Sequence, residues 1–148
     1  MLQFELRPED LEREVPALRL TREFGVPHLT LAENLWNDRY GDMNDPQVLG
    51  FSETEKNNRA LPMKVFHAFV DELHLLICTT DRKYANLRRK MAELNGKPAA
   101  LIVSTLSAAL AATLGIAAGI LTPFVAIALH GIMVLGINTV CRMTEGYR

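Results

Sequence analysis

The feature that most constrains this 148-residue chain is a long uncharged stretch in its last third. No Asp, Glu, Lys or Arg occurs between Lys97 and Arg142. A helix crosses a bilayer with about 20 apolar residues, so one continuous helix of this length would be about twice too long. Two helices joined by a turn fit better. The sequence therefore predicts a transmembrane hairpin, with a first helix over about 99–119 and a second over about 123–141.

Proline and basic residues predict the turn and the orientation of this hairpin. Pro98 and Pro123 each lack an N–H and are best tolerated in the first turn of a helix, so we expect the turn at Gly119–Phe124. Basic residues lie on both sides of the hairpin, whereas the turn has no charge. Basic flanks favour the cytoplasmic side of a membrane. We therefore expect a multi-pass protein of the cell inner membrane with both termini cytoplasmic.

Two alternatives to constant insertion stay open at this point. The hairpin could be the buried core of a soluble protein, or it could be hidden in water and insert on a trigger. The Ala/Gly-rich hairpin in the last third of the chain is similar in composition to that of pore-forming colicins. That resemblance implies a hairpin that is hidden in water and inserts on a trigger. It matches no individual residue of this chain to a colicin residue.

Small residues recur at helical spacing along the first predicted span. Lipid offers no hydrophobic reason for helices to associate, so close backbone approach through small side chains matters more there. We expect a packing face that joins the two helices of one hairpin, or that also joins subunits of a homo-oligomer. Its members are Ser104, Ala108, Ala111, Ala112, Gly115 and Gly119.

The second predicted span carries two polar residues, His130 and Asn138. An ionisable residue within a membrane indicates a functional site by default. With a turn near 120–122, Thr113 should lie at the depth of His130 and could accept its hydrogen bond. Alternatively, His130 lines the lumen of an oligomer, where its protonation tunes gating. Asn138 could hydrogen-bond across helices or line a vestibule.

Charge divides the rest of the chain. Residues 1–60 carry a net charge of −5, and residues 61–98 carry +3. We therefore expect a cytosolic helical head over 1–79, a basic amphipathic neck over 80–97 and the hairpin over 98–148, in an all-α fold. Helix signals in the head predict a helix over about 8–23 kinked at Pro16, a second from Thr30 to about Tyr40, and a capping box at 52–55.

Two patterns follow in the second half of the head and in the neck. Apolar residues at helical spacing indicate a bundle core or a docking stripe for a partner: Met63, Phe66, Val70, Leu73 and Ile77. Basic residues then predict a helix lying on anionic headgroups, or a solvated bundle face: Arg82, Lys83, Arg88, Arg89, Lys90 and Lys97. Nucleic acid is not an expected partner, because aromatic residues are not interleaved with these charges.

The sequence contains no recognisable catalytic motif. His67, Asp71 and His74 share one helix face, which we interpret as a polar stripe rather than as metal ligands. Cys78 and Cys141 are expected to be ordinary thiols. We therefore expect no catalytic residues, no metal, no cofactor and no enzyme activity.

These features favour a membrane effector. In this interpretation the head is triggered by a cytosolic sensor protein or ligand bound by residues 1–79, and the hairpins assemble into a pore or disrupt the bilayer. The architecture is similar to that of two-helix membrane effectors in bacterial antiphage defence, which is an analogy of architecture only. The alternative is an adaptor whose hairpin is only an anchor and whose head holds a protein partner at the inner membrane.

Overall fold

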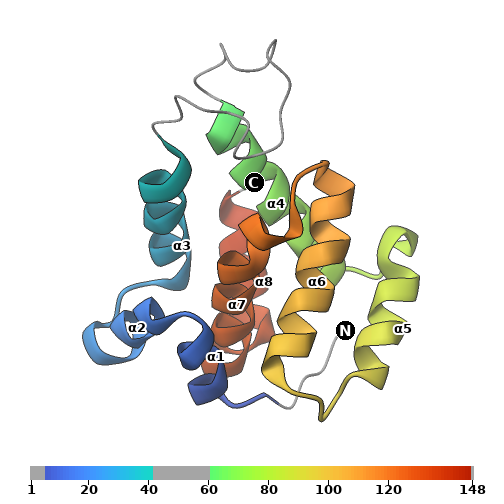
Figure 1. The fold of residues 1–148 in the computed structure, drawn as a ribbon, viewed down its shortest axis with the longest axis horizontal. Coiled ribbons are helices and arrows are strands. Elements are labelled where there is room, and N and C mark those ends of the chain that lie inside the picture. The colour runs from blue at the N-terminus through green and yellow to red at the C-terminus, as the bar shows by residue number, and fades with distance from the viewer. Residues whose placement is uncertain (1–5, 42–60, 148) are drawn as a thin grey trace.

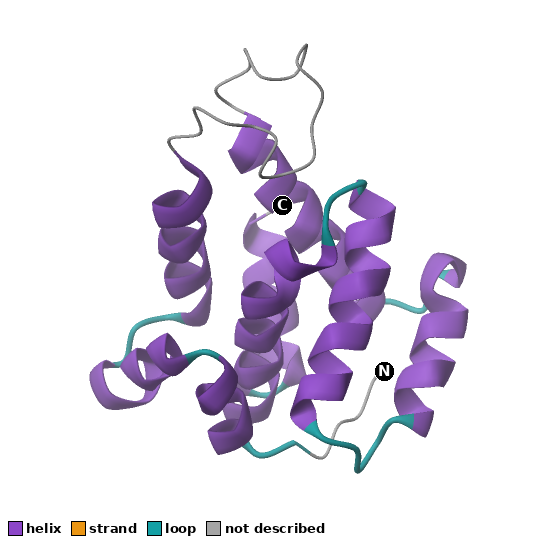
Figure 2. Ribbon diagram, viewed as in Figure 1, coloured by secondary structure: helices purple, strands orange, loops and turns teal. Residues whose placement is uncertain are grey.

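The computed structural model describes residues 6–41 and 61–147. These residues form helices and their connections, with no strand among them, so the predicted all-α fold class is confirmed (Figures 1 and 2). The predicted capping box at 52–55 lies outside the described residues.

Proline and glycine set the boundaries of the first helices. Pro8 lies in the first turn of α1, where its missing N–H has no intrahelical partner to lose. Pro16 cannot continue that helix, and one 3-10 turn leads directly into α2. Gly25 ends α2 in the left-handed conformation, with φ +68°. The elements are α1 (Pro8–Glu14), η1 (Pro16–Leu18), α2 (Arg19–Phe24), α3 (His28–Trp36) and the π turn η2 (Asn37–Gly41).

The middle of the chain forms a long helix and a short one tied to its end. They are α4 (Leu61–Cys78), the 3-10 turn η5 (Arg82–Tyr84) and α5 (Ala85–Glu93). The guanidinium of Arg88 donates to the carbonyl oxygens of Leu75, Leu76 and Asp81 at 2.6 to 2.9 Å. The last carbonyls of a helix lack intrahelical partners, so Arg88 satisfies two of them and fixes α5 beside the end of α4.

The apolar stretch folds into three helices rather than two, α6 (Ala99–Leu114), α7 (Ala118–Leu135) and α8 (Ile137–Tyr147). The prediction of a turn at 119–124 was wrong. Gly115 ends α6 with φ +73°, and Pro123 lies inside α7, where its missing N–H removes one backbone hydrogen bond. The second predicted span is also divided, because Gly136 (φ +89°) ends α7.

Among the described residues, α7 is the one helix long and apolar enough to cross a bilayer. The α6 helix is apolar but has only 16 residues. A two-span hairpin is therefore not confirmed, and the multi-pass topology and the orientation of the termini stay predictions. In the structure 56% of α7 is buried within the protein, as the core helix of a helical bundle would be.

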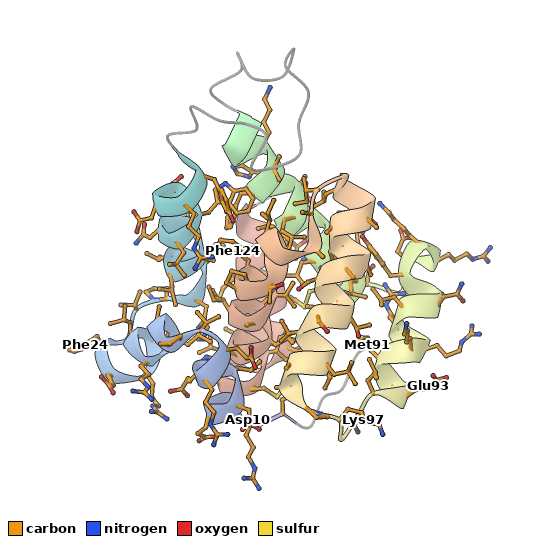
Figure 3. All side chains as sticks on the ribbon, in the orientation of Figure 1. Asp10, Phe24, Met91, Glu93, Lys97 and Phe124 are labelled. Atoms are coloured by element: carbon orange, nitrogen blue, oxygen red, sulfur yellow. A yellow bond between two sulfur atoms is a disulfide. The ribbon has the colours of Figure 1, made fainter. Side chains whose placement is uncertain are left out.

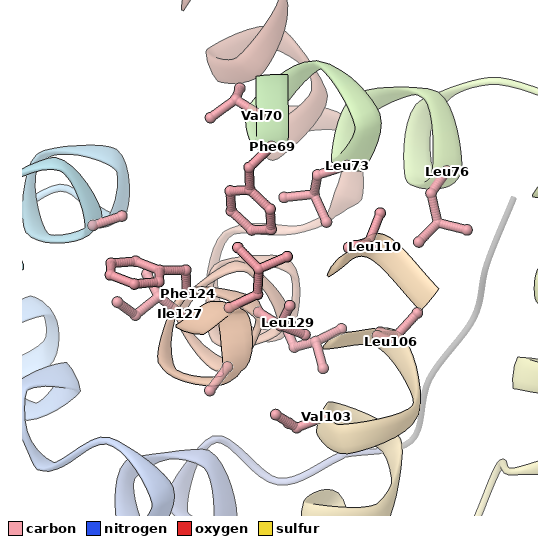
Figure 4. Close-up of a cluster of buried hydrophobic side chains, with 14 of the residues drawn as sticks. Phe69, Val70, Leu73, Leu76, Val103, Leu106, Leu110, Phe124, Ile127 and Leu129 are labelled. Carbon is pink, nitrogen blue, oxygen red and sulfur yellow. The ribbon is translucent and has the colours of Figure 1, made fainter. Parts of the chain in front are cut away.

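The α7 helix lies at the centre of the bundle and packs against α1, α3, α6 and α8, while α4 packs against α6 and α8 (Figure 1). The buried apolar side chains of all these elements form one core. Figure 4 shows part of it, with Phe69 and Leu73 of α4, Leu106 of α6 and Phe124 of α7 among the clustered buried side chains. Residues expected in a separate head therefore cover the helix that was expected in the membrane.

A disulfide joins two of these helices. Cys78 at the end of α4 is bonded to Cys141 in α8, with a Cα–Cα distance of 5.7 Å. The prediction of two ordinary thiols was wrong, because two cysteines 63 positions apart in the sequence give no indication that the fold brings them together.

Candidate functional site: a polar cluster in the core

A buried histidine pair joins the second half of α7 to the start of α3. His130 has none of its surface exposed, and its Nδ1 lies 2.8 Å from Nε2 of His28 at the start of α3. The two ring centroids are 5.1 Å apart. A buried imidazole needs hydrogen-bond partners to offset its lost hydration, and here each ring supplies a partner to the other.

An ion pair extends this contact toward the surface. Glu12, on the buried face of α1, places Oε2 3.4 Å from Nε2 of His130. Its other oxygen lies 3.0 Å from the guanidinium of Arg22, which is about half exposed. We refer to Glu12, Arg22, His28 and His130 as the histidine cluster. It connects α1, α2 and α3 to α7 through polar contacts alone.

A glycine allows the two helices to approach this closely. A Cβ at Gly131 would lie 3.3 Å from Cγ of the His28 ring, which is tighter than ordinary van der Waals contact. Glycine in the middle of a helix costs about 1 kcal/mol relative to alanine. Gly131 is therefore better explained by the approach of His28 than by the needs of α7 itself.

The hydrogen bonds define the arrangement of protons at neutral pH. A carboxylate only accepts, so Nε2–H of His130 donates to Glu12 and Nδ1 of His130 must accept from Nε2–H of His28. One added proton can be accommodated on Nδ1 of His130, which then donates to His28 while Nε2 still donates to Glu12. His28 accepts this hydrogen bond at Nε2 if its own proton moves to Nδ1. A second proton would set two N–H donors against each other across 2.8 Å, and the contact would break.

The surroundings of His28 oppose its charged form. Burial in the apolar core, and secondarily the charge of His130, lower the pKa of His28 from 6.5 to about 4. Other polar groups around the pair are few in the described part of the chain. Thr144 of α8 shares an apolar cavity with His28 and is hydrogen-bonded to His74 of α4 at 2.7 Å. The α6 sequence has no charged residue.

The other polar residues predicted in the apolar stretch do not join this cluster. Thr113 is exposed, and its hydroxyl donates to the carbonyl of Ala109, so the predicted partnership with His130 was wrong. The reason is the turn, which lies at 115–117 instead of 120–122 and shifts the pairing of the two helices. Asn138 is exposed in the first turn of α8.

The predicted small-residue face is not a single surface of one helix. Gly115 ends α6 and Gly119 belongs to α7, so they do not follow one another along a helix. Ala111 is buried in the core. The remaining row, Ser104, Ala108 and Ala112, is exposed on α6, and Ser104 and Ala108 line a surface groove together with Leu87 and Lys90 of α5.

The apolar stripe of α4 is part of the core. Phe66, Val70, Leu73 and Ile77 are all at most 5% exposed, so they are not available as a docking surface in this structure. Met63 belongs to the first turn of α4, and its side chain lies outside the described residues.

The predicted basic neck is only partly a surface. Arg88 turns inward to the end of α4, and Lys83 forms an ion pair with Glu72 at 2.7 Å. Figure 3 shows Lys97 at the edge of the bundle while Phe124 points inward. The exposed basic residues of this segment are Arg82, Lys83, Arg89, Lys90 and Lys97.

Among the residues the structure describes, no group of three or more His, Cys, Asp or Glu could hold a metal ion. His74 is buried against α8 rather than on a solvated polar stripe, whereas His67 is exposed. The polar stripe predicted from their spacing is therefore not one surface.

Sequence reasoning identified His130 but missed its partners. His130 was conspicuous as an ionisable residue in an apolar stretch. His28 and Glu12 lie 102 and 118 residues away, in segments whose polar residues are common. Only the fold brings them to His130.

Comparison with known proteins found no matching family, no matching curated protein and no matching solved structure. Function is therefore inferred from the geometry of the cluster and of the helix that carries it.

Proposed function

We propose that this protein is a membrane-active effector, and that the bundle is its form before insertion. On triggering, α6 and α7 leave the other helices and enter a bilayer, where they form a pore or disrupt the membrane. The observation that supports this most is the combination found in α7. The helix is long and apolar enough to span a bilayer, yet a buried cluster of titratable groups is bonded to its second half.

The histidine cluster costs more free energy to bury than apolar side chains in the same place would. Burying a polar group costs free energy unless its hydrogen bonds are complete, and apolar side chains of similar size would fill the same space without that cost. Buried ionic groups are best known in proteins as determinants of register or as switches. A role as a switch explains why these polar groups are buried against α7, the helix that is proposed to move.

Protonation is the trigger that the geometry favours. A second proton on the histidine pair removes the bond between α3 and α7 and adds charge to the core. In the released form each imidazole can take up its proton in water, so acid favours release. The histidine cluster also adjoins an apolar cavity of about 50 Å³ between α3, α4, α7 and α8. Because side chains do not fill this cavity, van der Waals contacts there do not compensate for the loss of the His28–His130 hydrogen bond.

The exposed row of Ser104, Ala108 and Ala112 supports the assembly step of the proposal. These residues are exposed on α6 in the bundle, two of them in the groove beside α5. Once α6 lies in a bilayer, they would allow close approach of a second copy, as small residues do in membrane helices. The exposed basic residues of α5 favour vesicles with anionic lipids as the first target.

Release of a fluorescent dye from anionic vesicles tests this function. The full chain, with its disulfide reduced, should release little dye at about pH 7.4 and much more at about pH 4.5. His130→Gln and His28→Gln keep a polar side chain but cannot be protonated, so both should lose most of the acid response. His67→Gln, at an exposed histidine of α4, is the matched control and should respond like the unmodified protein.

The same variants can be tested in cells. Induced expression in bacteria loaded with a membrane-potential dye should depolarise them, and His130→Gln should depolarise them less at equal protein level. The proposed function is wrong if the reduced protein releases no dye at either pH while circular dichroism shows that it remains helical, and if induced expression leaves the potential unchanged.

A further inference from the structure

We propose that the Cys78–Cys141 disulfide is a redox control on the release of α7, so that full insertion requires its reduction. This inference rests on the function proposed above. The bond closes a covalent loop of the chain that contains all of α5, α6 and α7. This covalent loop therefore includes α6 and α7, the helices that must move.

The position of the bond determines which movement it limits. Cys141 lies six residues after Leu135, the last residue of α7. Six residues span at most about 20 Å when fully extended, and the disulfide adds a Cα–Cα distance of 5.7 Å. The oxidised chain therefore keeps this end of α7 within about 26 Å of the end of α4. With the bond reduced, α8 can follow α7 without α4.

A second contact lies on the same seam. His74 of α4 and Thr144 of α8 are hydrogen-bonded at 2.7 Å, each one helical turn from a bonded cysteine. In the described structure these two links fasten α8 to α4. After reduction the hydrogen bond and the packing of α8 on α4 would remain without the covalent link, so α8 should then separate from α4 more readily.

The bond is accessible to a reductant, since both cysteines are only partly buried. A dithiol thiolate attacks one sulfur, forms a mixed disulfide and releases the other cysteine as a thiolate. The second thiol of the reductant then displaces the first cysteine. Two electrons reach the protein, its thiolates take up two protons and the reductant ends as a disulfide. Disulfides inside cells are usually of this transient kind.

Dye release from the same anionic vesicles, at about pH 4.5, tests the inference with dithiothreitol as the dithiol. The reduced protein should release dye about tenfold faster than the oxidised protein, a difference of about 1.4 kcal/mol in the barrier. A Cys78→Ser and Cys141→Ser double variant should match the reduced protein whether or not dithiothreitol is present. That insensitivity controls for effects of the reagent on the vesicles.

Hydrogen exchange of the amides of α8 gives a readout that does not depend on membranes. In the oxidised protein α8 should stay protected at acid pH, and reduction should increase its exchange rate about tenfold. Faster exchange without any dye release would support the redox control and contradict the proposed function. Equal release and equal exchange in oxidised and reduced protein would overturn the redox control, whatever the vesicles show.

Discussion

At the scale of single residues, the charge of His28 should govern how the bundle responds to acid. Its pKa is lowered from 6.5 to about 4 by burial and by His130. A histidine whose pKa is lowered by folding stabilises the fold fully above its unfolded pKa, and that contribution is lost as pH falls toward the folded value. The relevant window is therefore between pH 6.5 and about 4.

We expect the free energy of unfolding to fall by up to about 3 kcal/mol across this window because of His28. Urea denaturation at several pH values measures it. His28→Gln should flatten the slope, and His67→Gln should leave it unchanged. Carboxylates titrate near the acid end in all three proteins, so the comparison is the difference between the variants. An equally steep slope in His28→Gln would contradict the assignment.

Gly131 gives a second test at the same scale. A methyl group there would push the His28 ring away by a few tenths of an ångström. Alanine stabilises a helix interior by about 1 kcal/mol relative to glycine, so the stability of Gly131→Ala should change little. The pKa of His28, followed by NMR, should nevertheless rise slightly, because the ring moves away from His130, the smaller of the two causes that lower it. An unchanged His28 titration would show that the close approach is unimportant.

At the scale of helices, the position of the turn between α6 and α7 separates two glycines that look alike in the sequence. Gly115 has φ +73°, whereas Gly119 is helical and a Cβ there would meet open space. Gly115→Ala should destabilise the protein by about 1 kcal/mol through backbone strain, and Gly119→Ala should stabilise it by about 0.5 to 1 kcal/mol. Thermal unfolding measures both. The order would reverse if the turn lay at 119–124.

Arg88 should stabilise the end of α4 through its three carbonyl partners. Arg88→Met keeps much of the apolar stem and removes the donors, which should cost about 1 to 3 kcal/mol. The exposed neighbour Arg89→Met is the matched control and should change stability by less than about 0.5 kcal/mol. Equal effects of the two changes would place Arg88 in solvent rather than against α4.

Some of these helix boundaries and contacts can be predicted from the sequence, and others cannot. Local signals suffice for the start of α1 at Pro8, the end of α2 at Gly25 and the buried face of α4. The turn was misplaced because Gly115 and Pro123 both carry turn signals, and composition does not rank them. Nor does an apolar run distinguish a helix facing lipid from one covered by its own protein. The partners of His130 and Cys141 are set by tertiary contacts, which no local pattern encodes.

At the scale of the whole molecule, release of α7 should open the core around the single tryptophan. Trp36 is fully buried, and its ring lies 5.1 Å from that of Phe124 in α7. We expect its fluorescence to shift to longer wavelength, at about pH 4.5 with anionic vesicles, in step with dye release.

A relocated tryptophan provides the control for this measurement. Phe24 is 73% exposed and points away from the bundle (Figure 3). In a Trp36→Phe variant that also carries Phe24→Trp, emission should already be at long wavelength at neutral pH and should not shift further to the red. An unshifted Trp36 signal during dye release would mean that the core does not open.

The order of the helices along the chain has a consequence for biosynthesis. Two of the helices that pack against α7, α1 and α3, precede it by more than 80 residues, and they carry Glu12 and His28. A ribosome adds about 5 to 20 residues per second, so these helices leave the exit tunnel seconds before α7 does. When α7 emerges, the surfaces of α1 and α3 that cover it are already made. The interval in which a nascent apolar helix could recruit insertion machinery, or another unfinished chain, is correspondingly short.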